Sequence, residues 1–164
     1  MPYLIDSNCF IEAKNNYYAF DVCPGFWDWL EQENQLGIVC SIDKIADELK
    51  GHADQLADWA KSRARGFFLP LDQPALSSVG QIAQWASSPN AGFKPHVISA
   101  FLGCADPFLI AFALAHGHTV VSHERLIPGI KRVIKIPSVC QHFGIPYMTL
   151  FELLRLTGAK FVLP

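Results

Sequence analysis

The stretch Tyr3-Leu4-Ile5-Asp6-Ser7-Asn8-Cys9-Phe10-Ile11 decides the fold of this chain. A short apolar run stops at an acidic residue, Asp6, and a pattern with helical spacing begins directly after it. This arrangement predicts a buried strand that delivers Asp6 to its carboxyl end, followed at once by a helix. In open α/β sheets, ligands collect at the edge where strands end and helices begin.

The same alternation continues along the chain. Further short apolar runs that predict strands lie at residues 38–40, 67–69, 119–121 and 147–148. Helical patterns separate them, and Pro24, Pro107 and Pro137 are placed to open helices, where a missing N–H is tolerated. Alternating strands and helices predict an α/β fold with a three-layer α/β/α architecture and a central, mainly parallel sheet.

Four further segments need separate comment. We expect Ser41 to cap the helix that contains Glu48, and residues 15–18 to form a loop. Residues 93–104 mix apolar and small side chains, and their pattern assigns no element. The segment Thr149–Glu152 has the spacing of a capping box and predicts a last helix after it.

Composition bounds the class of protein. The chain has 164 residues, of which 51% are hydrophobic and 17% charged, so one compact domain over residues 1–164 is expected. No apolar run approaches the ~20 residues of a membrane span, and the first residues lack the features of a secretion signal. We therefore expect a cytoplasmic protein. The net charge of −2 gives no support to nucleic-acid binding through a global basic field.

Four acidic residues are the candidates for chemistry. Asp6 and Glu124 each follow a short apolar strand, Asp106 begins the helix before the second of these strands, and Glu48 lies in the helix after residues 38–40. Each alone has a structural explanation as a helix cap, a helix surface charge or a turn charge. In a parallel arrangement, however, all four face one end of the sheet.

Carboxylates that are packed together repel one another unless a cation neutralises them. A site built from oxygen ligands suits Mg²⁺ or Mn²⁺. The four acids, Asp6, Glu48, Asp106 and Glu124, are therefore predicted to bind one or two such ions. Asn8 and Ser122 are placed to orient these carboxylates or a bound water.

At these residues the sequence resembles the PIN-domain nucleases. That family has an Asp after the first strand, a Glu in a helix shortly before a Gly, an Asp that opens a later helix, and an acid after the following strand. The matching segments span nearly the whole chain: Leu4–Asn8, Ile45–Gly51, Ala105–Ala113 and Val120–Glu124, with residues 18–27 and 135–140 resembling one branch of the family. Two positions depart from the pattern, because Glu124 replaces the usual Asp and Ser122 the usual Thr.

The resemblance implies a PIN-like, Rossmann-like topology and a metal-dependent ribonuclease that hydrolyses RNA. Many members of the wider family are toxins of bacterial type II toxin–antitoxin pairs. The resemblance therefore implies RNA as the substrate, a protein antitoxin as a partner, and a possible homodimer, with no membrane association. The neighbouring Asp47 is an alternative to Glu48, which we favour because it stands three residues before Gly51 and borders the apolar face of its helix.

Substrate contacts are less sharply defined. Four basic residues are candidates to contact the phosphates of the RNA substrate. They are equally well explained as charged residues at a solvent-exposed edge of the protein. These residues are Arg125, Lys131, Arg132 and Lys135. Phe26, Trp27 and Trp29 have the chemistry to stack on bases. Core packing or a partner interface is the favoured interpretation of these three aromatic residues.

Two other functions stay open. A receiver-type domain that forms an aspartyl phosphate shares the sheet and the acids at strand ends. It requires a Lys directly after a later strand, and none follows residues 119–121. A catalytically weakened PIN-like module that binds RNA or protein without cleavage is the second alternative, because Glu124 is one methylene longer than the usual Asp.

Overall fold

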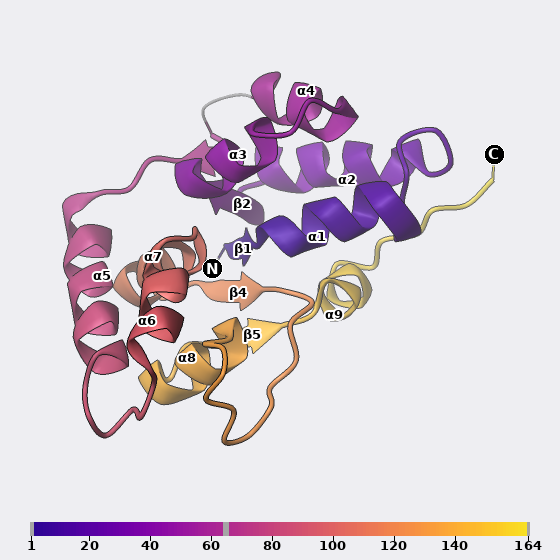
Figure 1. Ribbon diagram of the computed structural model, residues 1–164. Helices are drawn as coiled ribbons and strands as arrows, with labels where there is room; N and C mark the ends of the chain where they lie inside the picture. Colours follow the sequence, from indigo (N-terminus) through magenta and orange to yellow (C-terminus); the bar gives the residue numbers. More distant parts are fainter. Residues whose placement is uncertain (1, 64–65, 164) are drawn as a thin grey trace.

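Five parallel strands form the centre of the protein in a computed structural model that describes residues 2–63 and 66–163 (Figure 1). Their order across the sheet is β3-β2-β1-β4-β5, and every neighbouring pair is parallel. The strands are β1 (Tyr3–Ile5), β2 (Val39–Ile42), β3 (Phe68–Leu69), β4 (Thr119–Val121) and β5 (Tyr147–Met148). With helices on both sides of this sheet, the predicted three-layer α/β/α fold is confirmed, and the sheet is parallel throughout the described residues.

The helices fill the connections between the strands. In chain order they are α1 (Ser7–Glu12), the π-helical turn η1 (Ala13–Tyr17), α2 (Pro24–Gln35), α3 (Asp43–Lys50), α4 (Gln55–Lys61), α5 (Gln73–Ala86), α6 (Pro95–Leu102), α7 (Asp106–His116), α8 (Ile136–Phe143) and α9 (Leu150–Leu156). Helices α2 and α3 pack against β2, whereas α7 packs against β4 with α5 and α8 beside it. The long connection between β4 and α8, residues 122–135, leaves the sheet at the carboxyl end of β4 (Figure 1).

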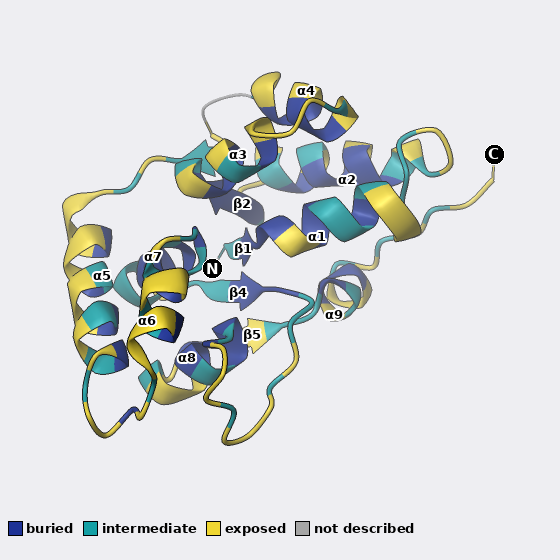
Figure 2. Ribbon diagram, in the orientation of Figure 1, coloured by how far each residue is buried: buried dark blue, intermediate teal, exposed yellow. Residues whose placement is uncertain are grey.

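The core lies between the sheet and these helices. The middle strands are buried, and the helices expose only their outer faces (Figure 2). Phe26, Trp27 and Trp29 are all buried in this core, and the ring of Trp27 stacks on that of Phe20 with the centroids 3.9 Å apart. The three aromatic residues of α2 are therefore core residues, as favoured, and not a surface for bases.

Two local predictions were wrong. Ser41 does not cap a helix, because it lies inside β2, where its hydroxyl donates to the backbone oxygen of Ile5 at 2.7 Å. The cap position of α3 is Ile42, which makes no side-chain capping bond. Residues 15–17 continue the first helix as the turn η1 instead of forming a loop, closed by the bond from Tyr18 N to Ala13 O at 2.7 Å.

The unassigned stretch contains a helix. Pro95 opens α6, and Val97 and Phe101 face the core four residues apart. Its β-branched and small residues gave no clear periodicity. The helix packs against α7, and tertiary packing supplies most of the stability of helices in proteins. No single helix within residues 2–63 and 66–163 is long and apolar enough to cross a membrane, although the pair α6 and α7, bent by 69°, meets that criterion when the two are joined.

The strand order places the predicted site at a special position. The chain moves outward from β1 to β2 and β3, then returns to the other side of β1 for β4 and β5. The carboxyl ends of β1 and β4 therefore meet at the point where the order reverses, which is where ligands bind in sheets of this type. Asp6 follows β1, and Ser122 and Glu124 follow β4.

The capping box at the start of α9 is confirmed. The Thr149 hydroxyl accepts from the Glu152 backbone N–H at 3.2 Å, and the Glu152 carboxylate accepts from the Thr149 N–H at 2.7 Å. We expect Thr149→Ala to lower the free energy of unfolding by about 1 kcal/mol, because it leaves a helix N–H without a partner. Urea denaturation measures this change.

Ser77→Ala is the control for Thr149→Ala. The exposed Ser77 hydroxyl donates only to the backbone oxygen of Gln73 within α5, so its loss should change stability by less than about 0.5 kcal/mol. Equal effects of the two substitutions would show that the capping box does not stabilise α9.

Candidate active site

Asp6 is a buried carboxylate, with no exposed surface, at the carboxyl end of β1. Its backbone N–H donates to Val121 O at 2.9 Å and so extends the pairing with β4. Asp6 occupies the cap position of α1, but its side chain makes no capping bond. Instead its carboxylate accepts from the Ser122 hydroxyl at 2.9 Å, and the Ser7 hydroxyl lies 3.4 Å away. Helix capping therefore does not explain this acid.

Burial and neighbouring charge strongly disfavour ionisation of Asp6. Its pKa is raised from 3.8 to about 7, first by burial and then by the negative charges of Asp106 and Glu124. The hydrogen bond from Ser122 lowers the pKa and offsets only part of this effect. In the described residues, the ion pairs are Lys14–Asp54, Arg63–Glu31 and His116–Asp72, so no basic side chain there pairs with Asp6.

Asp106 is the second acid with a perturbed pKa. Burial, followed by the charges of Glu124 and Glu48, raises its pKa from 3.8 to about 6. A helix cap, one of the structural explanations for these acids, does not apply to Asp106, because Ala105 is the cap residue of α7 and Asp106 is the first helical residue. A hydrogen bond with the Cys104 side chain lowers the pKa of Asp106 and offsets part of the increase.

Glu48 reaches the same place from α3. Its Oε1 accepts from the backbone N–H of Ala105 at 2.9 Å, although the two residues are 57 positions apart in sequence. Glu48 is half-buried, whereas Asp47 is exposed. The negative charge of Glu48 also raises the pKa of Asp106. Of the two adjacent acids, Glu48 is thus the one that joins the cluster.

Glu124 connects the cluster to α8. Its backbone N–H donates to the Ser122 hydroxyl at 3.1 Å, and its Oε2 accepts from the N–H of Ile136, at the start of α8, at 2.7 Å. Ser122 therefore links Asp6 and Glu124 directly, since the same hydroxyl bonds both residues. The extra methylene of Glu124, compared with Asp, lets its carboxylate reach the first turn of α8.

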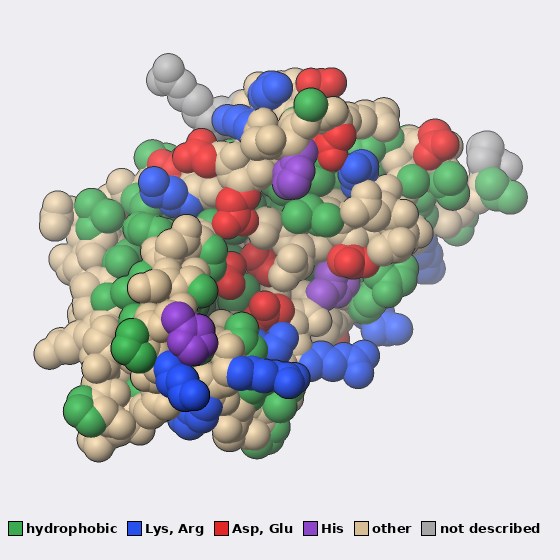
Figure 3. All heavy atoms as spheres, viewed as in Figure 1, with side chains coloured by type: hydrophobic (Ala, Val, Ile, Leu, Met, Phe, Trp, Pro, Cys, Tyr) green, Lys and Arg blue, Asp and Glu red, His purple; other side chains and the backbone are tan. Residues whose placement is uncertain are grey.

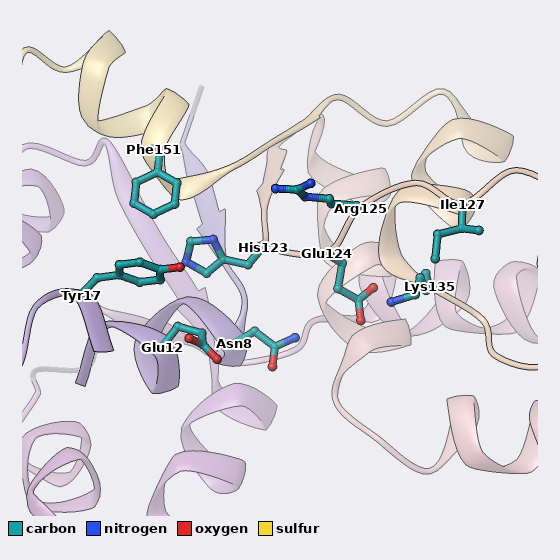
Figure 4. Close-up of a pocket in the computed structure, with 9 residues that line it drawn as sticks. All are labelled: Asn8, Glu12, Tyr17, His123, Glu124, Arg125, Ile127, Lys135 and Phe151. Carbon is teal, nitrogen blue, oxygen red and sulfur yellow. The ribbon is translucent and has the colours of Figure 1, made fainter. Parts of the chain in front are cut away.

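Two pockets flank Glu124. A pocket of about 530 Å³ contains Asn8, Glu124, Arg125 and Lys135 among its lining residues (Figure 4). A second pocket of about 210 Å³ is lined by Asp106, Glu124 and Arg132, with apolar residues of α6. Acidic side chains gather in the middle of one face of the molecule, with Lys and Arg side chains beside them (Figure 3).

The basic residues divide into two groups. Arg125 and Lys135 share a pocket with Glu124, and Arg132 shares the other pocket with Asp106 and Glu124. Lys131 does not line either pocket beside Glu124. Its ammonium donates to Ala91 O at 2.7 Å, lies 4.8 Å from the centroid of the Phe93 ring, and lines a separate pocket.

Sequence reasoning missed several residues around the acids. Glu12, Tyr17, His123 and Phe151 line the larger pocket, and Cys104 lines the smaller one. No local sequence pattern predicts the π-helical turn that ends at Tyr17. None predicts that α9 places Phe151 beside this turn. His123 stands between Ser122 and Glu124, so its position next to two predicted residues was the one available hint.

The donor set of the cluster fits a hard divalent cation, since the four predicted ligands are all carboxylates. The buried Asp6 and the half-buried Asp106 also lack a cationic partner in the described residues. Within those residues, however, no group of three or more His, Cys, Asp or Glu side chains already has the arrangement of a metal site. Glu48 accepts from the backbone N–H of Ala105, the cap residue of α7, and Glu124 accepts from the N–H of Ile136 in α8. One carboxylate oxygen of each residue is therefore already hydrogen-bonded to the backbone.

Comparison with known proteins gives a family but no activity. The family described as "Domain of unknown function (DUF4411)" matches residues 3–161, and this span includes all four acids. No curated protein matches the sequence.

Proposed function

Because the chain belongs to the DUF4411 family, a domain of unknown function, we propose its activity from the site itself: it is a metal-dependent ribonuclease that hydrolyses RNA phosphodiester bonds. The observation that carries the proposal is the gathering of Asp6, Asp106 and Glu124 at the strand-order reversal, where burial and then mutual repulsion raise the pKa values of Asp6 and Asp106. Among the described residues, no ion pair offsets these charges. Such a cluster costs free energy in the folded protein unless a bound cation offsets the negative charges. The resemblance to PIN-domain nucleases rests on the same acids.

Asp6, Glu48, Asp106 and Glu124 would hold Mg²⁺ or Mn²⁺. The bound cation would supply a water of lowered pKa and would offset negative charge on the attacked phosphate. Ser122 fixes the orientation of the Asp6 carboxylate through its 2.9 Å hydrogen bond. Asn8 lines the pocket beside Glu124 and is placed to orient a water there.

Three basic residues complete the proposed substrate site. Arg125 and Lys135 on one side of Glu124, and Arg132 on the other, supply positive charge for the phosphates that flank the cleaved bond. This local charge replaces the global basic field that a chain of net charge −2 lacks. Lys131 is left out of this group, because its ammonium is bonded to Ala91 O.

The biological role proposed here follows from the resemblance alone. It is that of a cytoplasmic toxin of a type II toxin–antitoxin pair, with a protein antitoxin as its partner and homodimer formation possible. A small reading frame beside the gene, encoding the antitoxin, would support this role.

A catalytically weakened module that binds RNA or protein is the second candidate. The observation that favours it is that no group of three His, Cys, Asp or Glu side chains in the described residues has the arrangement of a metal site. The two candidates predict different results in one assay. Single-stranded RNA is incubated with the protein and Mn²⁺, and in parallel with the protein and a chelator. Cleavage in the Mn²⁺ sample but not in the chelator sample supports the ribonuclease. No cleavage in either sample would refute it.

Glu48→Gln tests the assignment of the acid on α3. We expect its rate of cleavage to fall about tenfold or more, because the substitution removes the negative charge that faces Asp106 but keeps an oxygen for the Ala105 N–H. Initial rates at saturating Mn²⁺ measure the effect.

Asp47→Asn is the matched control for Glu48→Gln. It removes one negative charge from the same helix at an exposed position, so the rate should stay within about twofold of wild type. A larger loss from Asp47→Asn than from Glu48→Gln would reverse the assignment.

A further inference from the structure

The larger pocket beside Glu124 has an aromatic wall. Tyr17 comes from the end of η1, His123 from the residues after β4, and Phe151 from the first turn of α9 (Figure 4). The centroids of Tyr17 and Phe151 lie 5.2 Å apart with the rings perpendicular, and His123 lies 5.3 Å from Phe151. Three segments distant in sequence thus build one aromatic surface at the edge of the acid cluster.

This aromatic wall is accessible. Tyr17 is 54% exposed, although a large aromatic side chain is ordinarily buried when packing is its only role. The π-helical turn adds one residue to the helical repeat and ends at Tyr17, beside the pocket. Such turns occur frequently at functional sites.

The opposite wall of the pocket is basic. Figure 4 shows Lys135 and Glu124 on the side away from Tyr17 and Phe151, whereas the guanidinium of Arg125 points back toward the aromatic side, across the pocket from Asn8. Lys135 points toward Glu124. A phosphate bound between Arg125 and Lys135 therefore lies next to the carboxylate that the pocket shares with the acid cluster.

Charge sets the direction in which a nucleotide enters. Glu12 lies on the aromatic side, where its carboxylate accepts from the Asn16 side chain at 2.7 Å. A phosphate is repelled by Glu12 on the aromatic side, whereas on the other side Arg125 and Lys135 attract it and outnumber the single negative charge of Glu124. A neutral base, which has a flat face for stacking and polar edges, suits the aromatic side.

We propose that this pocket is a nucleotide subsite for single-stranded RNA, with the base against Tyr17 and Phe151 and the phosphate between Arg125 and Lys135. The subsite rests on the proposed ribonuclease function and adds its substrate class, since a base can stack in the pocket only when it is free of a duplex. Its volume of about 530 Å³ lies in the range of small-ligand pockets.

Binding is measured separately from cleavage. A short fluorescent single-stranded RNA is titrated with Asp106→Asn protein in Mg²⁺, and anisotropy gives the dissociation constant without turnover. In this background, Tyr17→Ala and Phe151→Ala should each weaken binding about tenfold, because each removes a stacking face. Tyr17→Phe should bind as tightly as the parent, since it keeps the ring. Duplex RNA of the same sequence should bind less tightly and lose little affinity on Tyr17→Ala.

Tyr147→Ala is the matched control. Tyr147 is 40% exposed on β5 and lines neither pocket beside the acids, so its loss should leave RNA affinity unchanged. Far-UV circular dichroism of every variant verifies the fold. If Tyr17→Ala and Phe151→Ala bind single-stranded RNA as tightly as Tyr147→Ala does, the nucleotide subsite is overturned. The pocket would then be a candidate site for a segment of a protein partner.

The two proposals fail separately. RNA cleavage by wild type, with a KM that Tyr17→Ala leaves unchanged, would overturn the subsite and keep the ribonuclease. Ring-dependent RNA binding by a wild-type protein that cleaves nothing with Mn²⁺ would support the subsite as an RNA-binding site and refute the ribonuclease.

Discussion

Asp6→Asn is expected to abolish metal-dependent RNA cleavage and, at the same time, to make the metal-free protein more stable at pH 8. Cleavage should fall by about a hundredfold or more, because a lost metal ligand removes several kcal/mol of transition-state stabilisation. The stability gain has a different cause. Asp6 has no exposed surface, and its pKa of about 7 means that the folded protein resists its ionisation.

The size of the stability gain follows from the raised pKa. The difference between 3.8 and about 7 corresponds to about 4 kcal/mol at pH values where the carboxylate is ionised in both states. Asn has nearly the same shape, carries no charge, and keeps an oxygen for the Ser122 hydroxyl. We therefore expect the free energy of unfolding, from urea denaturation in chelator, to rise by about 2–4 kcal/mol.

Mg²⁺ should narrow this difference in stability between wild type and Asp6→Asn. A ligand that binds only the folded state at a hundred times its dissociation constant stabilises by about 2.7 kcal/mol. Wild type should gain this stabilisation and Asp6→Asn should not. Asp47→Asn, the same chemical change at an exposed position, should shift the free energy of unfolding by less than about 0.5 kcal/mol in either condition. If Asp6→Asn instead destabilises the metal-free protein, Asp6 is a structural residue and the proposed metal site is lost.

The second large effect is a pH dependence that Asp6→Asn removes. The pKa values of Asp6 and Asp106 in the folded protein, about 7 and about 6, both exceed the ordinary value of 3.8. Between pH 4 and pH 7 these two carboxyl groups therefore bind more protons in the folded state than in the unfolded state. Under this condition, the free energy of unfolding decreases as the pH rises. The destabilisation by Asp6 should thus be absent near pH 4 and complete above pH 7.

Other groups act in the opposite direction, so the comparison must be made between variants. Burial lowers the pKa of His118 and His123, and stability from these residues is lost as the pH falls below 6.5. Their contribution is largely shared by wild type and Asp6→Asn and cancels in the difference.

The difference in free energy of unfolding between Asp6→Asn and wild type is therefore the quantity to plot. Measured in chelator at pH 5, 6, 7 and 8, it should grow steadily with pH and level off above about pH 7. A difference that stays constant over this range would mean that Asp6 ionises normally, contrary to the burial and charge around it.

Local sequence determined the elements and the positions of the acids within them. The apolar run ending at Asp6, the Pro residues that open α2, α7 and α8, and the capping box at Thr149 are signals read within a few residues. Each depends on backbone groups or on the spacing of apolar residues nearby, so no tertiary information was needed. The parallel three-layer fold followed from the alternation of these elements.

Tertiary structure decided what the acids face and what surrounds them. The bond from Ser122 to Asp6 joins residues 116 positions apart, and the bond from Ala105 to Glu48 spans 57 positions. Burial, which controls the pKa of Asp6, arises only when β1 lies between β2 and β4. The wall of Tyr17 and Phe151 likewise exists only because η1 and α9 pack side by side. Charge repulsion, burial and stacking depend on distance in space, and a sequence records only distance along the chain.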